Sequence, residues 1–191
     1  LELDPAGLTR VRRYDDGVDV LGAEGSLGLD LWAGRLRLTA GVELYQDLVS
    51  SRLEEARSED GFRFSSPARG NFTDGSGYTD LGVYLHGEVD LWIFSSGAGL
   101  LRASGGLRYS YFGAKAAEVP GLGDVDFGID GVVGSLGLAV ILPDWLNVYA
   151  SFVQGFRAPN LQETTVLGDT GDRFEVPNPD LGPELAHTLE L

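Results

Sequence analysis

A histidine and two carboxylates alternate with apolar or small residues over one short stretch, at His86, Glu88 and Asp90. Imidazole and carboxylate groups together could hold a metal ion or take part in hydrolysis. The same alternation is also what the polar face of a β-strand presents, because successive side chains point to opposite faces. We interpret the three residues as the water-facing side of a strand, with an enzyme as the alternative.

A second group lies in an acidic segment near the end of the sequence, where Asp169, Asp172 and Glu175 could offer oxygen ligands to Ca²⁺. Their spacing matches no defined calcium loop, so we interpret the segment as a solvated acidic loop. The sequence contains no cysteine, which excludes a thiolate metal site. We therefore predict no metal site, no cofactor and no catalytic set of residues.

A third group surrounds this acidic segment and has the residue types that contact small ligands. An aromatic ring, a guanidinium and an amide come first, at Phe156, Arg157 and Asn160. Pro159 cannot donate to a strand ladder and biases Ala158 away from helix, so we expect a strand to end there. Arg157 can either pair with a neighbouring carboxylate and shape the segment, or contact a ligand directly. The candidate ligand-binding residues are Phe156, Arg157, Asn160, Asp169, Asp172, Arg173, Asn178 and Asp180.

Composition limits the classes of protein that can carry these groups. The net charge of −15 argues against binding of nucleic acid, because phosphate contacts need clustered Lys and Arg. Apolar residues make up 43% of the chain and glycines number 28, which is too apolar for disorder and too glycine-rich for a helical protein. No run of 18 apolar residues is present, which excludes a membrane-spanning helix but not the alternating strands of a barrel.

Apolar and polar residues alternate along most of the chain, a period typical of strands. From Arg35 to about Leu53, for example, the even positions are apolar as far as Leu44, and the odd positions are mostly polar. The residues before Asp16 are expected to form an eighth strand or a loop. The pattern predicts seven strands, at about 18–31, 35–53, 78–94, 100–115, 127–142, 146–156 and 183–191.

The connections between these strands alternate in length. Short turns are expected at 32–34, 95–99 and 143–145, and long loops at 54–77, 116–126 and 158–182. An up-and-down barrel with short turns on one side of a membrane and long loops on the other has this alternation. A soluble sandwich has no reason to keep it.

The three tryptophans, Trp32, Trp92 and Trp145, all lie at or beside the predicted short turns. Amphipathic rings gathered at one level are typical of a membrane interface, and Tyr109 and Tyr111 could form the opposite girdle. Trp92 falls on the polar parity of its strand, so either a bulge or a ring that faces the lumen is required there. The pattern predicts an all-β fold, a transmembrane up-and-down antiparallel β-barrel.

The strands are longer than the roughly 9–11 residues that a crossing needs, which argues against a small eight-stranded barrel. An open sheet edge is not tolerated in lipid. We therefore expect residues 1–191 to be an internal portion of one larger barrel domain, a partial barrel of about seven or eight strands, with partner strands outside this sequence.

Two motifs near the end of the chain resemble the barrel of TonB-dependent outer-membrane receptors. They are Gly155-Phe156-Arg157-Ala158-Pro159-Asn160 and Asn178-Pro179-Asp180-Leu181-Gly182-Pro183-Glu184, and Gly105-Gly106-Leu107-Arg108-Tyr109 is similar to a recurring strand phrase of the same barrels. The resemblance implies a barrel of about 22 strands around a plug domain. It also implies uptake of a scarce nutrient, most commonly a ferric siderophore or similar metal chelate.

The resemblance further implies outer-membrane lipid, a small-molecule chelate and the TonB complex as partners, and the bacterial outer membrane as location. The plug domain and a TonB-contacting segment are absent from this sequence, and contact with TonB would pass through the missing plug region. Haem receptors of the family carry a haem-binding histidine between two similar motifs, whereas residues 160–177 contain none here. The alternatives to a receptor are an outer-membrane barrel enzyme and a passive porin-like channel.

Overall fold

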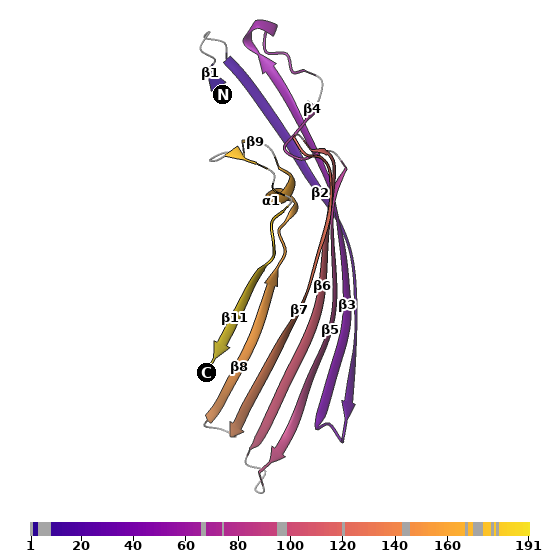
Figure 1. The fold of residues 1–191 in the computed structure, drawn as a ribbon, viewed down its shortest axis with the longest axis vertical. Coiled ribbons are helices and arrows are strands. Elements are labelled where there is room, and N and C mark those ends of the chain that lie inside the picture. Colours follow the sequence, from indigo (N-terminus) through magenta and orange to yellow (C-terminus); the bar gives the residue numbers. More distant parts are fainter. Residues whose placement is uncertain are drawn as a thin grey trace.

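A computed structural model describes residues 2–3, 9–65, 68–73, 75–94, 99–119, 121–142, 146–166, 168–169, 174–176, 178 and 180–191. They form one long, curved antiparallel sheet in the order β1-β2-β3-β5-β6-β7-β8-β11, with β4 added beside β3 (Figure 1). A second, two-stranded sheet pairs β9 with β10. The strands are β1 (Glu2–Leu3), β2 (Thr9–Leu31), β3 (Leu36–Arg57), β4 (Ala68–Arg69), β5 (Ser76–Ile93), β6 (Leu100–Val119), β7 (Gly123–Leu142), β8 (Leu146–Arg157), β9 (Gly168–Asp169), β10 (Phe174–Glu175) and β11 (Glu184–Glu190), and the helices are the 3-10 helix η1 (Ser58–Asp60) and α1 (Leu161–Thr165).

The seven predicted strands are all present, as β2, β3, β5, β6, β7, β8 and β11, and each of them pairs with its neighbour in sequence. The expected eighth strand before Asp16 is present as the two-residue β1, which pairs with the start of β2, and β2 itself begins earlier than predicted, at Thr9. β3 likewise continues to Arg57, past the expected start of the loop. The all-β, partial-barrel fold is therefore confirmed, with strands longer than expected at the long-loop end.

The predicted loop at 116–126 is wrong. β6 and β7 continue through it as a hairpin, with Ala116 opposite Val125 and Val119 opposite Gly123 across a bulge. Two of the glycines that suggested a loop, Gly121 and Gly123, lie at the tip of this hairpin and adopt φ angles of 80° and 78°. The predicted long loop at 158–182 also contains a helix, α1, which the sequence reading missed.

One face of the main sheet is apolar and uncovered. Direct partners in an antiparallel pair lie on the same face, and the register places Leu85, Leu107 and Leu136 together on this one. Leu107, Val132 and Leu136 are 62%, 66% and 68% exposed, whereas a soluble sheet would bury such a face. No helix in the described part of the chain is long and apolar enough to cross a membrane.

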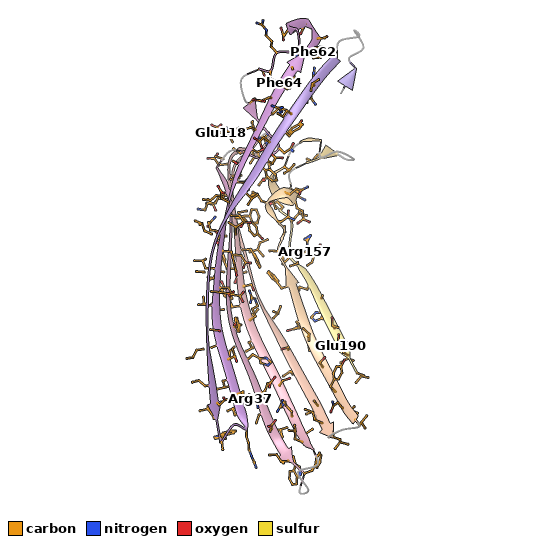
Figure 2. All side chains as sticks on the ribbon, turned by 180° about the vertical axis from the view of Figure 1, so that it is seen from behind. Arg37, Phe62, Phe64, Glu118, Arg157 and Glu190 are labelled. Atoms are coloured by element: carbon orange, nitrogen blue, oxygen red, sulfur yellow. The ribbon has the colours of Figure 1, made fainter. Side chains whose placement is uncertain are left out.

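The opposite face is polar near the short turns and carries a ladder of charges. Arg102 donates to Asp90 at 2.7 Å and lies 3.8 Å from Glu88, which in turn is 3.9 Å from Arg37. His86 lies 3.7 Å from Glu88, so the histidine and its two carboxylates belong to this ladder. Figure 2 shows Arg37 close to the short-turn end, far from Phe62 and Phe64 at the other end.

The sequence required either a bulge at Trp92 or a Trp92 ring that faces the lumen. The structure has the bulge, between Asp90 and Trp92. The register pairs Asp90 with Arg102 but Trp92 with Leu101, so one residue is inserted and Trp92 turns to the apolar face. Trp32 lies in the β2–β3 turn and is exposed, while Trp145 falls outside the described residues. Tyr109 lies on the same apolar face as Trp92, further along the sheet, opposite Val83 and Val132.

Toward the long-loop end, the polar face becomes apolar and forms the buried core. Val49, Ala114 and Leu161 make one cluster, against which Phe72, Tyr78 and Phe127 pack. Leu161 belongs to α1, which lies within the curve of the sheet together with β9 (Figure 1). The face that carries the charge ladder and α1 is therefore the concave one, and α1 covers part of its upper end.

Candidate ligand-binding rim

The two motifs found in the sequence meet where β8 ends. β11 pairs with β8 in antiparallel register, and this pairing places Glu184 of the second motif directly opposite Arg157 of the first. Pro159 ends the strand as expected, and α1 begins two residues later. We call this junction, made of residues 156–165 with Tyr78 and Glu184, the rim.

α1 begins with a capping box. Asn160 Oδ1 accepts a hydrogen bond from the Glu163 N–H at 2.9 Å, and a Glu163 carboxylate oxygen accepts from the Asn160 N–H at 3.0 Å. The hydroxyls of Thr164 and Thr165 donate to the carbonyls of Asn160 and Leu161. A five-residue helix is too short to be stable alone, so these bonds and the burial of Leu161 define its position.

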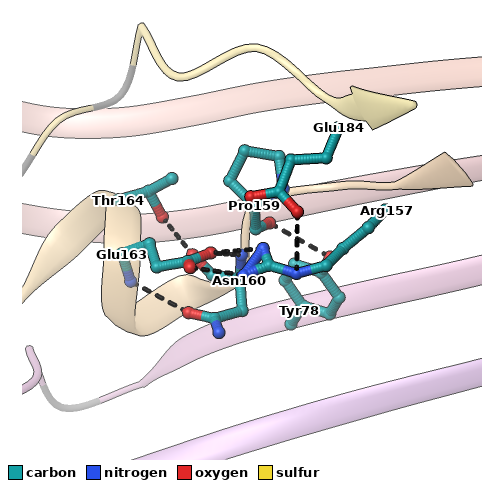
Figure 3. Close-up of polar contacts among 7 residues, drawn as sticks. All are labelled: Tyr78, Arg157, Pro159, Asn160, Glu163, Thr164 and Glu184. Carbon is teal, nitrogen blue, oxygen red and sulfur yellow. Dashed lines mark hydrogen bonds and ion pairs between the residues drawn. The ribbon is translucent and has the colours of Figure 1, made fainter. Parts of the chain in front are cut away.

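Arg157 holds α1 to the end of β8. Its two terminal nitrogens donate to the two oxygens of Glu163 at 2.6 and 3.2 Å, a bidentate arrangement, and its Nε lies 3.8 Å from Glu184 (Figure 3). One guanidinium therefore joins the first motif, α1 and the second motif. The sequence allowed two roles for Arg157, pairing with a neighbouring carboxylate or contact with a ligand. The structure contains the first of these, the carboxylate pairing.

A double-mutant cycle of Arg157→Ala and Glu163→Gln is expected to give a coupling energy of about 0.5–1 kcal/mol. The value is small because the two side chains are 51% and 35% exposed, so water screens the pair. It is measured from hydrogen exchange of the α1 amides in the full-length protein. The pair Lys115–Asp126, 77% and 67% exposed, is the control and should give almost none; equal coupling in both pairs would contradict the role of Arg157.

Tyr78 of β5 contacts the same junction from the strand side of α1, through a hydrogen bond and through packing. Its hydroxyl donates to the Pro159 carbonyl at 3.2 Å, and the ring packs against the cluster that contains Leu161. Burial, followed by the negative charges of Asp80, Asp47 and Glu163, raises the pKa of Tyr78 to about 12. The neutral phenol is thus the form that holds the Pro159 carbonyl.

Tyr78→Phe keeps the ring and removes the hydroxyl, so the α1 amides are expected to exchange about fivefold faster, as the loss of one hydrogen bond implies. Because the folded pKa is raised, the contribution of Tyr78 is fully present below pH 10 and is lost as the pH rises through about 12. An absorbance titration of tyrosinate checks this. The variant should lack one late-titrating tyrosine, and identical titration curves would refute the assignment.

Three aromatic rings line the concave face beside α1. Tyr78 of β5, Phe112 of β6 and Phe156 of β8 lie with ring centroids 6.1 and 5.9 Å apart, tilted by 36° and 27°. Phe156 reaches Phe112 across β7 because Gly131 lies in between, where a Cβ atom would be 2.7 Å from the Phe156 ring. We call these three residues the aromatic row; all three rings are partly exposed.

The other sequence candidates are more scattered. Asn178 and Asp180 are exposed, and Asn178 Oδ1 accepts from the Asp180 N–H at 3.2 Å, which makes a local turn. Asp169 lies in β9, where only the backbone is described, and Asp172 and Arg173 lie outside the described residues. The structure therefore brings Phe156, Arg157 and Asn160 together and leaves the remaining five without a described shared site.

Sequence reasoning missed Glu163 and Tyr78 of the rim and Phe112 of the aromatic row. The spacing Asn160-Leu161-Gln162-Glu163 is itself a capping-box signal, and it predicts both the start of α1 and the position of Glu163. Tyr78 and Phe112 carry no local signal, because only the register of β5, β6 and β8 brings them beside Phe156.

Comparisons with known proteins agree with this geometry. The family described as "TonB dependent receptor-like, beta-barrel" matches residues 3–191. A "Hemin receptor" of Yersinia enterocolitica is 36% identical over 66 residues, a stretch that covers 29% of this chain and 10% of that relative. The chain thus belongs to the TonB-dependent receptor β-barrel family, as a partial barrel of the bacterial outer membrane.

Proposed function

We propose that the barrel to which this chain contributes takes up a scarce nutrient in a TonB-dependent manner, with a ferric siderophore or similar metal chelate as its ligand. Membership of the receptor family supports uptake across the outer membrane. The plug domain, the TonB-contacting segment and the remaining strands are proposed to belong to the same protein outside these 191 residues.

The proposed class of ligand, a ferric chelate with aromatic groups, is inferred from the aromatic row. Three partly exposed rings from three strands form a continuous surface on the lumenal face, directly beside α1. Planar aromatic groups stack on such a surface, each pair worth about 0.5–1.5 kcal/mol beyond the area buried. A chelate that presents aromatic iron-binding groups, such as a catecholate, therefore fits the rim better than a purely aliphatic one.

The guanidinium of Arg157 strengthens this assignment. It is half exposed although Glu163 and Glu184 hold it, so one edge can still meet a negatively charged chelate. Phe156, Arg157 and Asn160 are proposed as the ligand contacts. Asp169, Asp172, Arg173, Asn178 and Asp180 remain proposed contacts from the outer part of the loop.

Haem is the second candidate, and the name of the Yersinia relative favours it. A porphyrin would also stack on the aromatic row. However, neither histidine of this chain is at the rim: His86 belongs to the charge ladder, and His187 stacks on Phe152 of β8, on the lipid-facing side. A haem at the rim would therefore receive no axial histidine from this chain.

Calorimetric titration of the full-length protein with a ferric catecholate, a ferric hydroxamate and hemin tests the proposal. The catecholate is expected to bind about tenfold more tightly than the hydroxamate, and hemin to show no histidine-dependent Soret shift. Equal affinities would remove the aromatic row from the explanation. Binding of neither ferric chelate, or a tight Soret shift abolished by His→Ala, would refute the siderophore assignment.

A further inference from the structure

β7 and β8 pair over only part of their lengths and diverge toward the long-loop end (Figure 1). Their last pair is Ser135 with Val153, whereas β7 continues to pair with β6 as far as Gly123. Beyond Val153, β8 pairs with β11 alone. Within the described part of the chain, residues 128–134 of β7 therefore have no strand partner on the β8 side. We call this unpaired stretch, made of residues 128–134 and 154–156, the seam.

The seam lies at the level of the outer membrane interface. Val132, in its middle, is the direct partner of Tyr109 on the lipid-facing side and is 66% exposed. Tyrosines at such a level are typical of the boundary between hydrocarbon and head groups. At the lower end of the seam, Gln154 Oε1 accepts a hydrogen bond from the Gly134 N–H at 3.1 Å. At this end, the two strands are therefore joined by a side chain in place of a backbone ladder.

The side chain of Phe156 passes from one side of the wall to the other at the seam. Phe152 is the direct partner of Leu136 on the lipid-facing side, and Phe156, four residues further on, has the same parity. Its ring nevertheless lies over Gly131 and stacks on Phe112 at 5.9 Å, on the lumenal face. The ring therefore passes the unpaired edge of β7, and the aromatic row ends at the seam.

Cavities border the seam on both sides. A groove of about 510 Å³ lies on the lipid-facing side, with Leu136 in its wall. A second cavity, of about 210 Å³, lies on the lumenal side and includes His86 of the charge ladder. Gly134 and Gln154 line both cavities, so the two meet at the lower end of the seam. Phe156 of the aromatic row follows Gln154 by two residues, which places the outer groove within reach of a molecule bound on that row.

We propose that the ligand is an amphiphilic chelate, whose aromatic iron-binding head stacks on the aromatic row while an apolar tail passes through the seam into the groove. The inference rests on the proposed function, from which the head group is taken. A tail that leaves the lumen at this level enters the apolar groove directly, and burial of its surface there strengthens binding. The groove receives the tail of the bound chelate, because Phe156 belongs both to the row and to the seam.

Calorimetric titration of the full-length protein in lipid nanodiscs compares a ferric catecholate with the same chelate carrying an alkyl tail. The tail has about six carbons, each of which can strengthen binding by about threefold when buried. Gly134→Leu fills the groove beside the seam, and Gly105→Leu fills it from β6; each new Cβ would meet a leucine side chain at 3.4 Å, an ordinary contact. The matched control is Gly25→Leu, on the lipid-facing side of β2, where a Cβ meets nothing within 4 Å.

The wild type and Gly25→Leu are expected to bind the tailed chelate about tenfold more tightly than the untailed one, whereas Gly134→Leu and Gly105→Leu should bind the two equally. A tenfold preference that persists in both groove variants would show that the tail only partitions into lipid, and would overturn the proposal. Equal affinities in the wild type would overturn it as well, while the proposed function would stand. Binding of neither chelate would refute the proposed function itself and this inference with it.

Discussion

Replacing Leu161 by aspartate is expected to detach α1 from the barrel mouth and to expose the 158–182 segment to added protease. Leu161 is only 7% exposed and packs with Val49 and Ala114, which are buried as well. A carboxylate in this cluster has no described cationic partner and would cost about 3 kcal/mol, more than a hundredfold in the opening equilibrium. Limited proteolysis of intact cells that display the full-length protein measures the effect.

Leu161→Met is the matched control for this experiment. It keeps the volume and the apolar character of the side chain, so its cost should stay below about 1.5 kcal/mol and its cleavage rate near that of the wild type. If Leu161→Asp were cleaved no faster than Leu161→Met, the docking of α1 on the lumenal face would be contradicted.

The double substitution Phe112→Leu with Phe156→Leu is expected to weaken binding of a ferric catecholate by about tenfold and binding of a hydroxamate hardly at all. Leucine keeps much of the apolar volume but removes the flat faces that stack, and two lost stacking contacts amount to about 1–2 kcal/mol. The affinities are measured by calorimetry on the full-length protein.

Phe127→Leu is the control for the aromatic row, because Phe127 lies on the same face of β7 but packs into the buried clusters instead. It should leave both affinities unchanged. A uniform loss for both chelates would show that the phenylalanines act only through the stability of the mouth.

Much of this fold was predictable because a barrel strand repeats its pattern over many residues. The alternation around Leu36 to Leu44 and the parity conflict at Trp92 led to the correct faces and to the bulge. The hairpin at 119–123 was not predictable from turn residues, because glycine and proline mark the tip of a hairpin as readily as a long loop. Strand ends beyond the membrane lack the alternation in polarity that defines the crossing. The alternation therefore predicts strands that are shorter than β2 and β3 are in the structure.

The rim was only partly predictable for a different reason. Arg157 and Asn160 stood out because their motif is local, whereas their partners Glu184 and Tyr78 are 27 and 79 residues from Arg157 along the chain. The pairing of β8 with β11 brings Glu184 beside Arg157, and the docking of α1 brings Tyr78 to the same junction. Both contacts exist only once the whole sheet has assembled, so no local sequence pattern predicts them.

Accumulation of a radiolabelled ferric catecholate by cells that express the full-length protein, with and without functional TonB, tests the proposed receptor role most directly. TonB-dependent uptake predicts accumulation only when TonB is functional, and a marked loss of it in the Leu161→Asp variant. Equal accumulation without TonB would indicate a passive channel, and the absence of accumulation in both strains would contradict uptake of this ligand class.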